Sequence, residues 1–363
     1  MFKTLLKKPC LIIRRIVLCP AGLFSRKRTV KNRDVKKILF LRHDRVGDMV
    51  LSTPVFRAFK EKYPDAAITV LASEQNHEII TNNPNVDEIL LYKGIRHFLH
   101  EVRTKKFDMA VDLFLTHDMK QAFMTFLSGA PYRLGFKDSG REIFFSVRSP
   151  AAQPQKRMVE HLSDLAQAAG AGAADSAPEI FLSKQEKAWA QSELSRMELE
   201  EAMIIALHPG AFYPSQRWPA ERFGESARQI IESYGAAVFI FGGKHESHLL
   251  EKIQHAAGVR SHIFCDLSLR QFMALLNCCR LLVCNNSGPL HIASALKIPT
   301  VSMTGPTVVP LWLPQGKNQI AVNKALHCSP CNRAECSDHS CMEQITVSEV
   351  MTEVNRQCEA LNG

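Results

Sequence analysis

Short apolar runs of strand length recur along this chain from residue 38 onward, and each is followed by enough residues for one helix. The runs cover residues 38–41, 68–72, 89–91 and 110–114 in the first half, and 204–207, 238–241, 281–284 and 300–303 in the second. Such alternation is typical of a parallel sheet that carries helices on both faces. With 363 residues the chain has room for two domains of this kind. We therefore predict an α/β protein with two doubly wound, Rossmann-like domains.

A stretch of small residues, AQAAGAGAADSA at 166–177, separates the two halves. It has little to pack into a core, which is typical of a linker. The sequence therefore predicts five segments. These are a basic tail over 1–37, an N-terminal domain over 38–170, a linker over 171–184, a C-terminal domain over 185–344 and a last helix over 345–363.

Residue pairs at helix-capping spacing predict several helix starts. They are Ser183 with Glu186, Ser268 with Gln271, Thr346 with Glu349, and Thr53 followed by Pro54. The first three pairs have the spacing of a capping box. In the fourth, threonine suits the cap and proline suits the first helical position, so a helix is expected to begin at residue 54.

The net charge of +9 is concentrated at the N-terminus. Residues 1–37 contain twelve Lys and Arg and one acid, and the rest of the chain contains 33 basic and 35 acidic residues. A slightly acidic body argues against nucleic acid as a partner. The apolar runs of the tail are too short to span a bilayer, which takes roughly 20 residues. We expect the tail to lie on an anionic membrane surface, and a solvated disordered tail is the alternative.

The stretch LLVCNNSGPLHIASAL at 281–296 carries the strongest ligand signal. It predicts a buried strand, a polar turn and a helix that opens with Pro289. The unpaired N–H groups and the positive dipole end of such a helix attract a phosphate. Gly288 permits close approach of a ligand to the backbone, and His291 adds a hydrogen-bond donor. An ordinary strand–turn–helix connection is the alternative.

Further polar turns follow the other predicted strands. They are 42–48 in the first half, and 208–217, 242–243 and 305–307 in the second. The carboxyl ends of parallel strands meet at one edge of a sheet, so we expect both sets of turns to face a central cleft between the domains. Glycines, a helix N-terminus and a cation suit a diphosphate, whereas the carboxylates of the first half suit proton removal.

Four of these motifs resemble, in order and spacing, those of the bacterial lipopolysaccharide heptosyltransferases, glycosyltransferase family 9. They are LRHDRVGDMVLSTPVFRAFKEKYPDAAITVL, LHPGAFYPSQRWPAERF, FGGKHE and NNSGPLHIASALKIPTVSMTGPT, and the resemblance covers most of 38–363. It implies a GT-B fold and inverting transfer of a heptose from ADP-L-glycero-D-manno-heptose to a hydroxyl of the lipid-linked lipopolysaccharide core. It implies no cofactor for catalysis, the ADP-sugar being a substrate, and a cytoplasmic location, peripheral on the inner membrane.

The resemblance also assigns roles to individual residues. Asp48 matches the proposed general base of the family, and Asp44 and His43 are its alternatives. A turn or cap residue is the purely structural interpretation of Asp48. At the donor nucleotide the resemblance implies Gly210, Arg217, Gly243, Glu246, Leu267, Asn286, Ser287, Gly288 and His291. Among these, Leu267 matches a position near adenine, and Glu246 is expected at the ribose.

Two departures from the family pattern bear on the donor. Gln216 stands where the family commonly has a phosphate-binding lysine, and the adjacent Arg217 is the candidate replacement. Asn286 stands where the family commonly has aspartate. Two alternatives therefore stay open: a family 9 transferase that uses another nucleotide sugar on another glycan, and a nucleotide-sugar-binding protein without turnover. A dinucleotide oxidoreductase is disfavoured because no G-x-G-x-x-G follows the first strand.

Four cysteines near the C-terminus have the spacing C-x2-C-x4-C-x4-C, at Cys328, Cys331, Cys336 and Cys341. They predict either a structural zinc site or free thiols that include a redox-sensitive pair. Eleven cysteines in so long a chain do not indicate a secreted disulfide scaffold, so we expect a reducing compartment. Arg133 is expected either to contact an anionic acceptor or to be an ordinary surface arginine.

Overall fold

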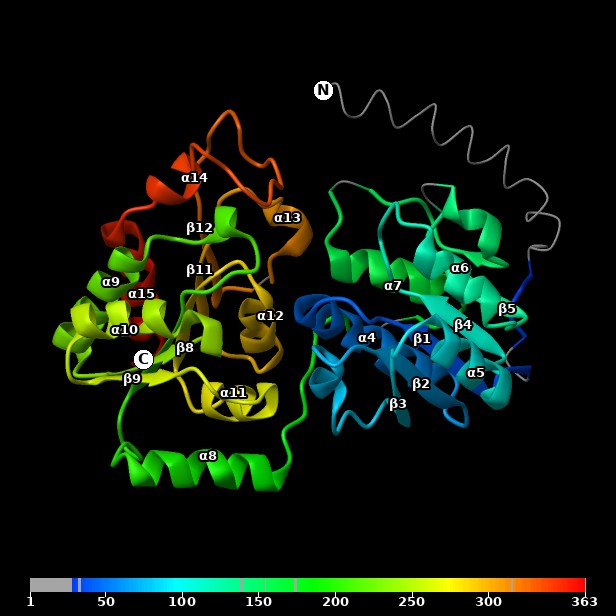
Figure 1. The fold of residues 1–363 in the computed structure, drawn as a ribbon, viewed down its shortest axis with the longest axis horizontal. Helices are drawn as coiled ribbons and strands as arrows, with labels where there is room; N and C mark the ends of the chain where they lie inside the picture. The colour runs from blue at the N-terminus through cyan, green and yellow to red at the C-terminus, as the bar shows by residue number, and fades with distance from the viewer. Residues whose placement is uncertain are drawn as a thin grey trace. The chain divides into compact units, whose positions relative to one another are not determined.

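The computed structural model describes residues 28–31, 34–137, 140–153, 155–172, 175–314 and 316–362. Most of the basic tail lies outside these ranges, and so does its expected contact with a membrane. No helix in the described ranges combines the length and apolar composition that crossing a membrane requires. The chain divides into two units between Pro178 and Glu179, and each unit has one sheet surrounded by helices (Figure 1).

The N-terminal unit is built on a six-stranded parallel sheet in the order β3-β2-β1-β4-β5-β6. Its strands are β1 (Lys37–Leu41), β2 (Ala67–Ala72), β3 (Glu88–Leu91), β4 (Met109–Asp112), β5 (Tyr132–Gly135) and β6 (Val147–Arg148). Its helices are α4 (Val46–Lys62), α5 (Ile95–Lys105), α6 (Lys120–Leu127) and α7 (Met158–Ala168), with 3-10 turns η2 (His77–Ile80) and η3 (Arg141–Phe144). The first four strands were predicted. The last two were not, because they are short and lack an apolar run.

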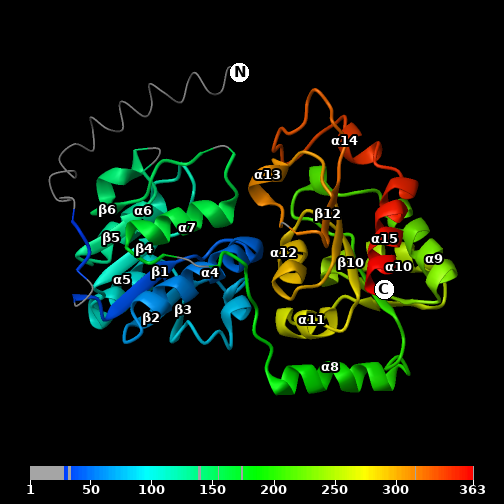
Figure 2. The ribbon, with the colours of Figure 1, turned by 180° about the vertical axis from the view of Figure 1, so that it is seen from behind.

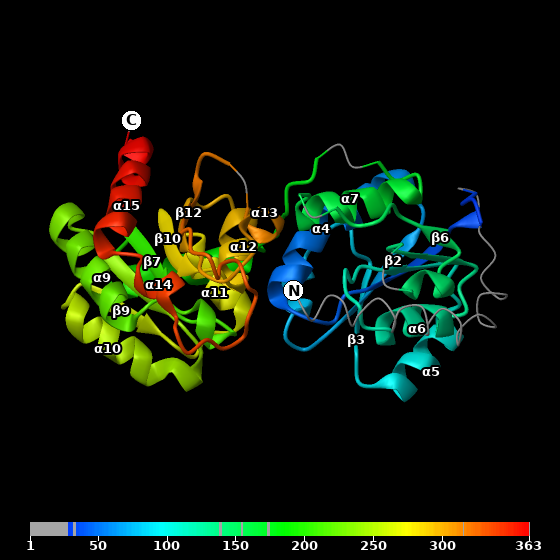
Figure 3. The same ribbon diagram turned by 90° about the horizontal axis from the view of Figure 1, so that it is seen from above.

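Neighbouring residues of β1 pack against helices on opposite faces of this sheet, as the strand period of two requires. Leu39 belongs to a core that also contains Phe98 of α5 and Met124 of α6. Phe40 points the other way, and its ring lies 5.1 Å from that of Phe56 on α4. Helices α4 and α7 accordingly cover one face, and α5 and α6 cover the other (Figure 3).

The expected start of α4 at residue 54 is wrong. The helix begins at Val46, and Pro54 lies inside it. Proline removes the N–H that would bond the carbonyl four residues earlier, which belongs to Val50. Here the hydroxyl of Thr53 donates to that carbonyl at 2.8 Å. The carbonyl therefore keeps a partner, and the helix continues through the proline. As a result Asp48 lies in the first turn of a helix.

The C-terminal unit has a second six-stranded parallel sheet, in the order β12-β11-β10-β7-β8-β9. Its strands are β7 (Ile204–His208), β8 (Ala237–Phe241), β9 (Ser261–Phe264), β10 (Leu281–Asn285), β11 (Thr300–Met303) and β12 (Gln319–Val322). Its helices are α8 (Lys184–Arg196), α9 (Ala220–Tyr234), α10 (Ser247–Ala257), α11 (Leu269–Leu276), α12 (Gly288–Ala295), α13 (Val309–Trp312), α14 (Ser340–Glu343) and α15 (Val347–Asn362), with 3-10 turns η4 (Pro214–Gln216) and η5 (Lys244–Glu246). The half-buried edge strands β9 and β12 were not predicted.

The main core of this unit lies between the sheet and helices α9, α10 and α15 (Figures 2 and 3). Val350, Val354 and Cys358 of α15 are fully buried in this core. Helices α11 and α12 lie on the opposite side of the sheet (Figures 2 and 3). The strand ends that carry the predicted donor residues are thus held between two packed layers.

All three predicted capping boxes form. Ser183 with Glu186, Ser268 with Gln271, and Thr346 with Glu349 each exchange two hydrogen bonds between side chain and backbone. These contacts span three residues, so the local sequence is sufficient to specify them. The first box opens α8, which ends at Arg196 rather than near residue 199.

Candidate active-site residues in the two domains

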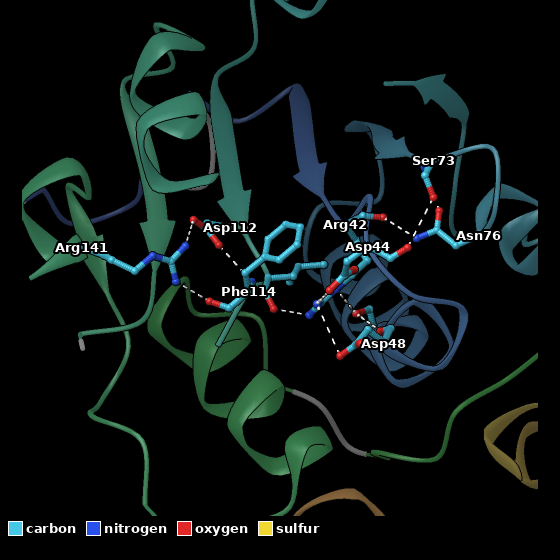
Figure 4. Close-up of polar contacts among 10 residues, drawn as sticks. Arg42, Asp44, Asp48, Ser73, Asn76, Asp112, Phe114 and Arg141 are labelled. Atoms are coloured by element: carbon cyan, nitrogen blue, oxygen red, sulfur yellow. Dashed lines mark hydrogen bonds and ion pairs between the residues drawn. The ribbon is translucent and has the colours of Figure 1, made fainter. Parts of the chain in front are cut away.

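In the N-terminal domain, Asp48 lies beside a buried arginine at the carboxyl end of β1. The guanidinium of Arg42, 2% exposed, is 3.8 Å from Oδ1 of Asp48 and donates to Oδ2 of Asp44 at 3.1 Å (Figure 4). The side chain of Asp48 is 14% exposed. Burial raises the pKa of the Asp48 carboxyl to about 6, although Arg42 acts to lower it. A carboxylate with a pKa close to the working pH suits general base catalysis.

Arg42 is held by contacts with three other parts of the domain. Its Nε donates to the hydroxyl of Ser52 on α4 at 3.0 Å, and its Nη2 donates to the carbonyl of Leu113 after β4. Its own carbonyl accepts from Nδ2 of Asn76, in the connection after β2, at 3.0 Å. Its guanidinium carbon also lies 5.0 Å from the centre of the Phe114 ring. The turn that carries the candidate base is therefore fixed on several sides (Figure 4).

A buried ion pair fixes the loop after β4. Arg141 donates to Oδ2 of Asp112 at 2.5 Å and to the carbonyl of Phe114 at 2.5 Å (Figure 4). The other oxygen of Asp112 accepts from the backbone N–H of Phe114 at 2.9 Å. Sequence reasoning missed this pair, because its members are 29 positions apart and no local pattern links them. The pair holds Phe114 beneath Arg42.

The two alternatives to Asp48 are placed less favourably for proton removal. Asp44 is 30% exposed, and one of its oxygens accepts the hydrogen bond from Arg42. The ring of His43 lies against Tyr92 and Phe114, at centroid distances of 4.6 Å and 5.3 Å. Burial lowers the pKa of His43 to about 4, so it is a weak base at neutral pH. The arrangement favours Asp48.

In the C-terminal domain, one buried side chain joins two of the predicted turns and the start of the segment that leads to α9. Asn285, the last residue of β10, donates from Nδ2 to the carbonyl of Pro209 at 2.7 Å and accepts the N–H of Trp218 at 3.0 Å. It thereby ties the turn after β10 to the turn after β7 and to the Trp-Pro pair. Sequence reasoning missed Asn285 and singled out its neighbour Asn286. The adjacent asparagines at a strand end were the available signal.

Three predicted donor residues come together at the turns after β7 and β8. Glu246 accepts the N–H of Gly243 at 2.9 Å. A side chain at Gly210 would place a Cβ only 2.4 Å from Oε1 of Glu246, so only glycine leaves room for this carboxylate. The structure therefore holds the candidate ribose-binding group between two glycine turns. Leu267 follows β9 at the same edge of the sheet and is half-buried.

The turn after β10 leads directly into α12, which begins at Gly288. Its N-cap residue Ser287 makes no side-chain capping hydrogen bond. Pro289 has no N–H, and the N–H of Leu290 donates to the carbonyl of Ser287 at 3.1 Å, which leaves the N–H of Gly288 and the positive end of the helix dipole to face an anion. His291 is 7% exposed, and its Nδ1 has no hydrogen-bond partner among the described residues. Burial lowers the pKa of His291 to about 4, so the ring is neutral at pH 7. Asn286, also buried, donates its N–H to the carbonyl of Met303.

The two residues at the site of the family lysine differ in their surroundings. Gln216 donates from Nε2 to the hydroxyl of Thr307 at 3.1 Å, and so binds the turn after β11. Arg217 is exposed and uses its Nε to bond the carbonyl of Ala211 at 2.9 Å. Of the two residues, Arg217 carries the charge, and its position is set by the turn after β7.

Burial raises the pKa of the Cys341 thiol, and the nearby Cys331, Cys328 and Cys336 raise it further, so the four C-terminal cysteines gather in one place as free thiols. Among the residues that the structure describes, no group of three or more His, Cys, Asp or Glu has an arrangement that holds an ion, so the zinc alternative has no support here. Arg133 is not a surface arginine. It is 9% exposed, because its Nε and Nη1 donate to the carbonyls of Phe144 and Ala130 at the sheet edge. Its contact with an acceptor stays a prediction.

Two Rossmann-like domains define the class of protein. In the N-terminal domain, a buried carboxylate with a raised pKa lies at the carboxyl ends of the strands. In the C-terminal domain, the strand ends carry glycine turns, a carboxylate and a helix N-terminus, which suit a nucleotide diphosphate. This combination is that of a GT-B glycosyltransferase.

Comparison with known proteins identifies the family. Residues 95–341 match the profile of glycosyltransferase family 9 (heptosyltransferase). Lipopolysaccharide heptosyltransferase 2 of Escherichia coli K12 is 28% identical over 344 residues, which cover 88% of this chain and 97% of that protein. Lipopolysaccharide heptosyltransferase 2 of Salmonella typhimurium is 30% identical over 294 residues, 75% of this chain and 83% of that protein.

A solved structure agrees. The structure of E. coli ADP-heptose lipopolysaccharide heptosyltransferase II has a TM-score of 0.76 with this chain at 25% identity, over 90% of this chain and 100% of that one. The chain belongs to glycosyltransferase family 9 and is a glycosyl-transferring enzyme. The family and the GT-B fold predicted from the sequence motifs are confirmed.

Proposed function

We propose that the protein transfers a heptose from ADP-L-glycero-D-manno-heptose to a hydroxyl of the lipopolysaccharide inner core, with inversion at the anomeric carbon. The proposal is supported by relatives named lipopolysaccharide heptosyltransferase 2 that match over nearly their whole length. The observation that carries the chemistry is the setting of Asp48, a largely buried carboxylate with a pKa raised to about 6 at the strand ends of the N-terminal domain.

In this mechanism Asp48 accepts the proton of the acceptor hydroxyl as its oxygen attacks the anomeric carbon. The new carbon–oxygen bond forms on the face opposite the leaving group, and the bond from the anomeric carbon to the phosphate oxygen breaks. ADP departs with that electron pair. The N-terminus of α12, His291 and Arg217 then stabilise the negative charge on the diphosphate, while Glu246 accepts hydrogen bonds from the ribose. Each of these steps uses only side chains of the protein and the two substrates.

A second candidate function is transfer of another sugar from another nucleotide. Gln216 bonds to Thr307 and carries no charge, so the donor site lacks the lysine common in the family. The guanidinium of the adjacent Arg217 is bonded through Nε to the carbonyl of Ala211, so this contact sets its direction and not a bound phosphate. A different nucleotide or sugar then fits the same fold and the same general base.

A donor screen followed by a transfer assay tests the proposed function. Calorimetric titration with ADP, UDP and GDP is expected to show a clear preference for ADP. Incubation with ADP-heptose and a heptose-deficient core acceptor is expected to add the mass of one heptose, and Asp48→Asn is expected to bind ADP normally but to lose transfer by about 10² or more. Preference for UDP or GDP would favour the second candidate. If the wild type binds ADP but transfers no heptose to this acceptor, the proposed donor and acceptor are wrong.

We also propose that residues 1–37 hold the enzyme on the cytoplasmic face of the inner membrane. The support is the charge of that segment, twelve cations against one acid, together with its short apolar runs. Each cation near an anionic surface contributes about 1 kcal/mol of binding free energy. A lipid-linked acceptor makes such a location useful to the proposed reaction.

A further inference from the structure

One buried arginine in the N-terminal domain lies at different distances from two carboxylates. The Nη1 of Arg42 donates to Oδ2 of Asp44 at 3.1 Å and lies 3.8 Å from Oδ1 of Asp48. Arg42 cannot turn further toward Asp48 without losing other contacts, because its Nε bonds Ser52 and its Nη2 bonds the carbonyl of Leu113. The geometry therefore keeps the guanidinium close to Asp48 but commits its best-placed donor to Asp44 (Figure 4).

We propose that Arg42 is a positioning residue for the general base and that Asp44 tunes it: Arg42 orients Asp48 and favours its charged form, while Asp44 holds Arg42 back from pairing fully with Asp48. This inference rests on the proposed function. Arg42 is not itself a catalytic residue, because at 2% exposure it is sealed from an acceptor. Asp44, at 30% exposure, serves here as the anchor of the arginine rather than as a base.

The surroundings of Asp48 make the proposal specific. The charged groups that act on its carboxylate are Arg42, Asp44 and Arg45, all from the connection between β1 and α4. Asp112 of β4 also interacts electrostatically with Arg42, and His43 with both Arg42 and Asp44. The hydrogen bonds and ring contact from the neighbouring connections come from uncharged groups. The connection after β2 supplies the amide of Asn76 and the hydroxyl of Ser73, and the loop after β4 supplies a carbonyl and the Phe114 ring. His43 points instead into its contacts with Tyr92 and Phe114.

Ser52 links the arginine to the backbone of the base. Its hydroxyl accepts from Nε of Arg42 at 3.0 Å and donates to the carbonyl of Asp48 at 2.7 Å. Arg42 thus fixes both the main chain and the side chain of the same residue. A guanidinium suits this work because it presents several donors in one rigid plane, whereas a lysine ammonium does not.

The proposal predicts opposite effects for two substitutions that each remove one charge. Arg42→Gln removes a cation beside Asp48, so the acid limb of kcat/KM is expected to move to higher pH, by about one unit for a neighbouring charge at this distance. Asp44→Asn removes an anion and frees Arg42 for Asp48, so the acid limb is expected to move to lower pH. A loop that is merely loosened would lower the rate of both variants without shifting their acid limbs in opposite directions.

The experiment is a pH profile of kcat/KM for the wild type, Arg42→Gln, Arg42→Lys and Asp44→Asn. Arg42→Lys keeps the charge but not the planar fork of donors. The acid limb of its kcat/KM profile is expected to lie close to that of the wild type, while the kcat/KM value on the plateau stays about tenfold or more below the wild-type value. Arg57→Gln is the matched control. Arg57 is also on α4 but bonds the carbonyl of Asp175, so its acid limb is expected to stay where the wild type has it.

Two readouts separate failure of this inference from failure of the proposed function. Circular dichroism and thermal unfolding show whether the N-terminal domain of each variant is folded, and calorimetric binding of ADP shows whether the C-terminal domain is intact. Asp48→Asn tests the base itself, and full activity in that variant would overturn the proposed function and this inference together. Loss of activity in Asp48→Asn, with acid limbs of Arg42→Gln and Asp44→Asn that stay in place or move the same way, would overturn the inference alone. If Arg42→Gln does not fold, the direction of the Asp44→Asn shift decides.

Discussion

The carboxyl group of Asp48 is acted on by burial and by a buried guanidinium in opposite directions. Burial is the larger effect, and it raises the pKa of the group to about 6 from the ordinary 3.8. A base with this pKa is mostly ionised at neutral pH, yet it is basic enough to accept a proton from an attacking hydroxyl. Transfer by the wild type is accordingly expected to fall as the pH drops through about 6.

The raised pKa of Asp48 predicts that Asp48→Asn has a larger free energy of unfolding than the wild type at neutral pH, although the variant loses transfer activity. Between pH 4 and pH 6 the folded state retains a proton that the unfolded state releases, so the wild type loses stability as the pH rises through this window. A neutral asparagine avoids that loss. A pKa shift of about two units corresponds to about 3 kcal/mol in the free energy of unfolding. The variant is expected to be more stable than the wild type by this amount above pH 6 and by nothing below pH 4.

Thermal unfolding followed by calorimetry at pH 4 and pH 8 checks this expectation. Asp164→Asn is a suitable control, because Asp164 pairs with Lys156 near the surface of α7 and lies in another part of the domain. A variant at position 48 that is less stable than the wild type at pH 8 would show that the carboxylate is not penalised by burial, and would remove the reason for its raised pKa.

At the scale of elements, turns from different strands depend on one another. The turns after β7 and β8 fit together because Gly210 has no side chain where the carboxylate of Glu246 lies. Asn285 then ties the turn after β10 to the turn after β7. The candidate donor residues thus come from strand ends that are adjacent in the sheet order and far apart in the sequence.

Gly210→Ala is therefore expected to weaken ADP binding roughly tenfold or more. The new Cβ would lie 2.4 Å from Oε1 of Glu246, so the carboxylate must move away from the proposed ribose position. Loss of one hydrogen bond to a charged group costs about 1.5–3 kcal/mol, and 1.4 kcal/mol is a factor of ten. Titration calorimetry with ADP measures the effect.

Gly172→Ala provides the control for that titration. An added Cβ at Gly172 meets nothing within 4 Å, so the affinity for ADP is expected to equal that of the wild type. Equal affinities of Gly210→Ala and the wild type would mean that Glu246 does not contact the nucleotide, and the ribose assignment would have to be given up.

At the scale of the whole molecule, the positive charge is concentrated at the N-terminal end of the sequence. The basic segment 1–37 carries the positive net charge, and the rest of the chain is slightly acidic. Residues 28–31 already belong to the N-terminal unit, where the N–H of Arg28 donates to the carbonyl of Ser146. A deletion that ends before residue 28 therefore leaves this contact in place.

Deletion of residues 1–27 removes seven of the twelve cations and both apolar runs, so it is expected to weaken binding to vesicles that contain anionic lipid, while transfer to a soluble core oligosaccharide stays at the wild-type rate. Binding of the full chain is expected to weaken as salt is raised, since screening shortens the reach of surface charges. Co-sedimentation with anionic and with neutral vesicles measures both. Undiminished binding after the deletion would place the membrane contact elsewhere on the protein.

The sequence by itself determined those features that depend on neighbouring residues. Apolar periodicity specified most of the strands, three capping boxes specified helix starts, and four ordered motifs specified the family. A strand or a capped helix is decided within a few positions, because its side-chain spacing and its first hydrogen bonds are local.

Only the tertiary structure decided the contacts that join distant segments. It paired Arg141 with Asp112, placed Asn285 between Pro209 and Trp218, and turned Arg133 inward. It also set the neighbours of Arg42, because a buried guanidinium takes whichever carbonyls and carboxylates the packed loops bring to it. Several of these partners, such as the carbonyl of Leu113 and the amide of Asn76, lie tens of positions away in the chain, so no local pattern reveals them. They hold in place the arginine that acts on the pKa of Asp48.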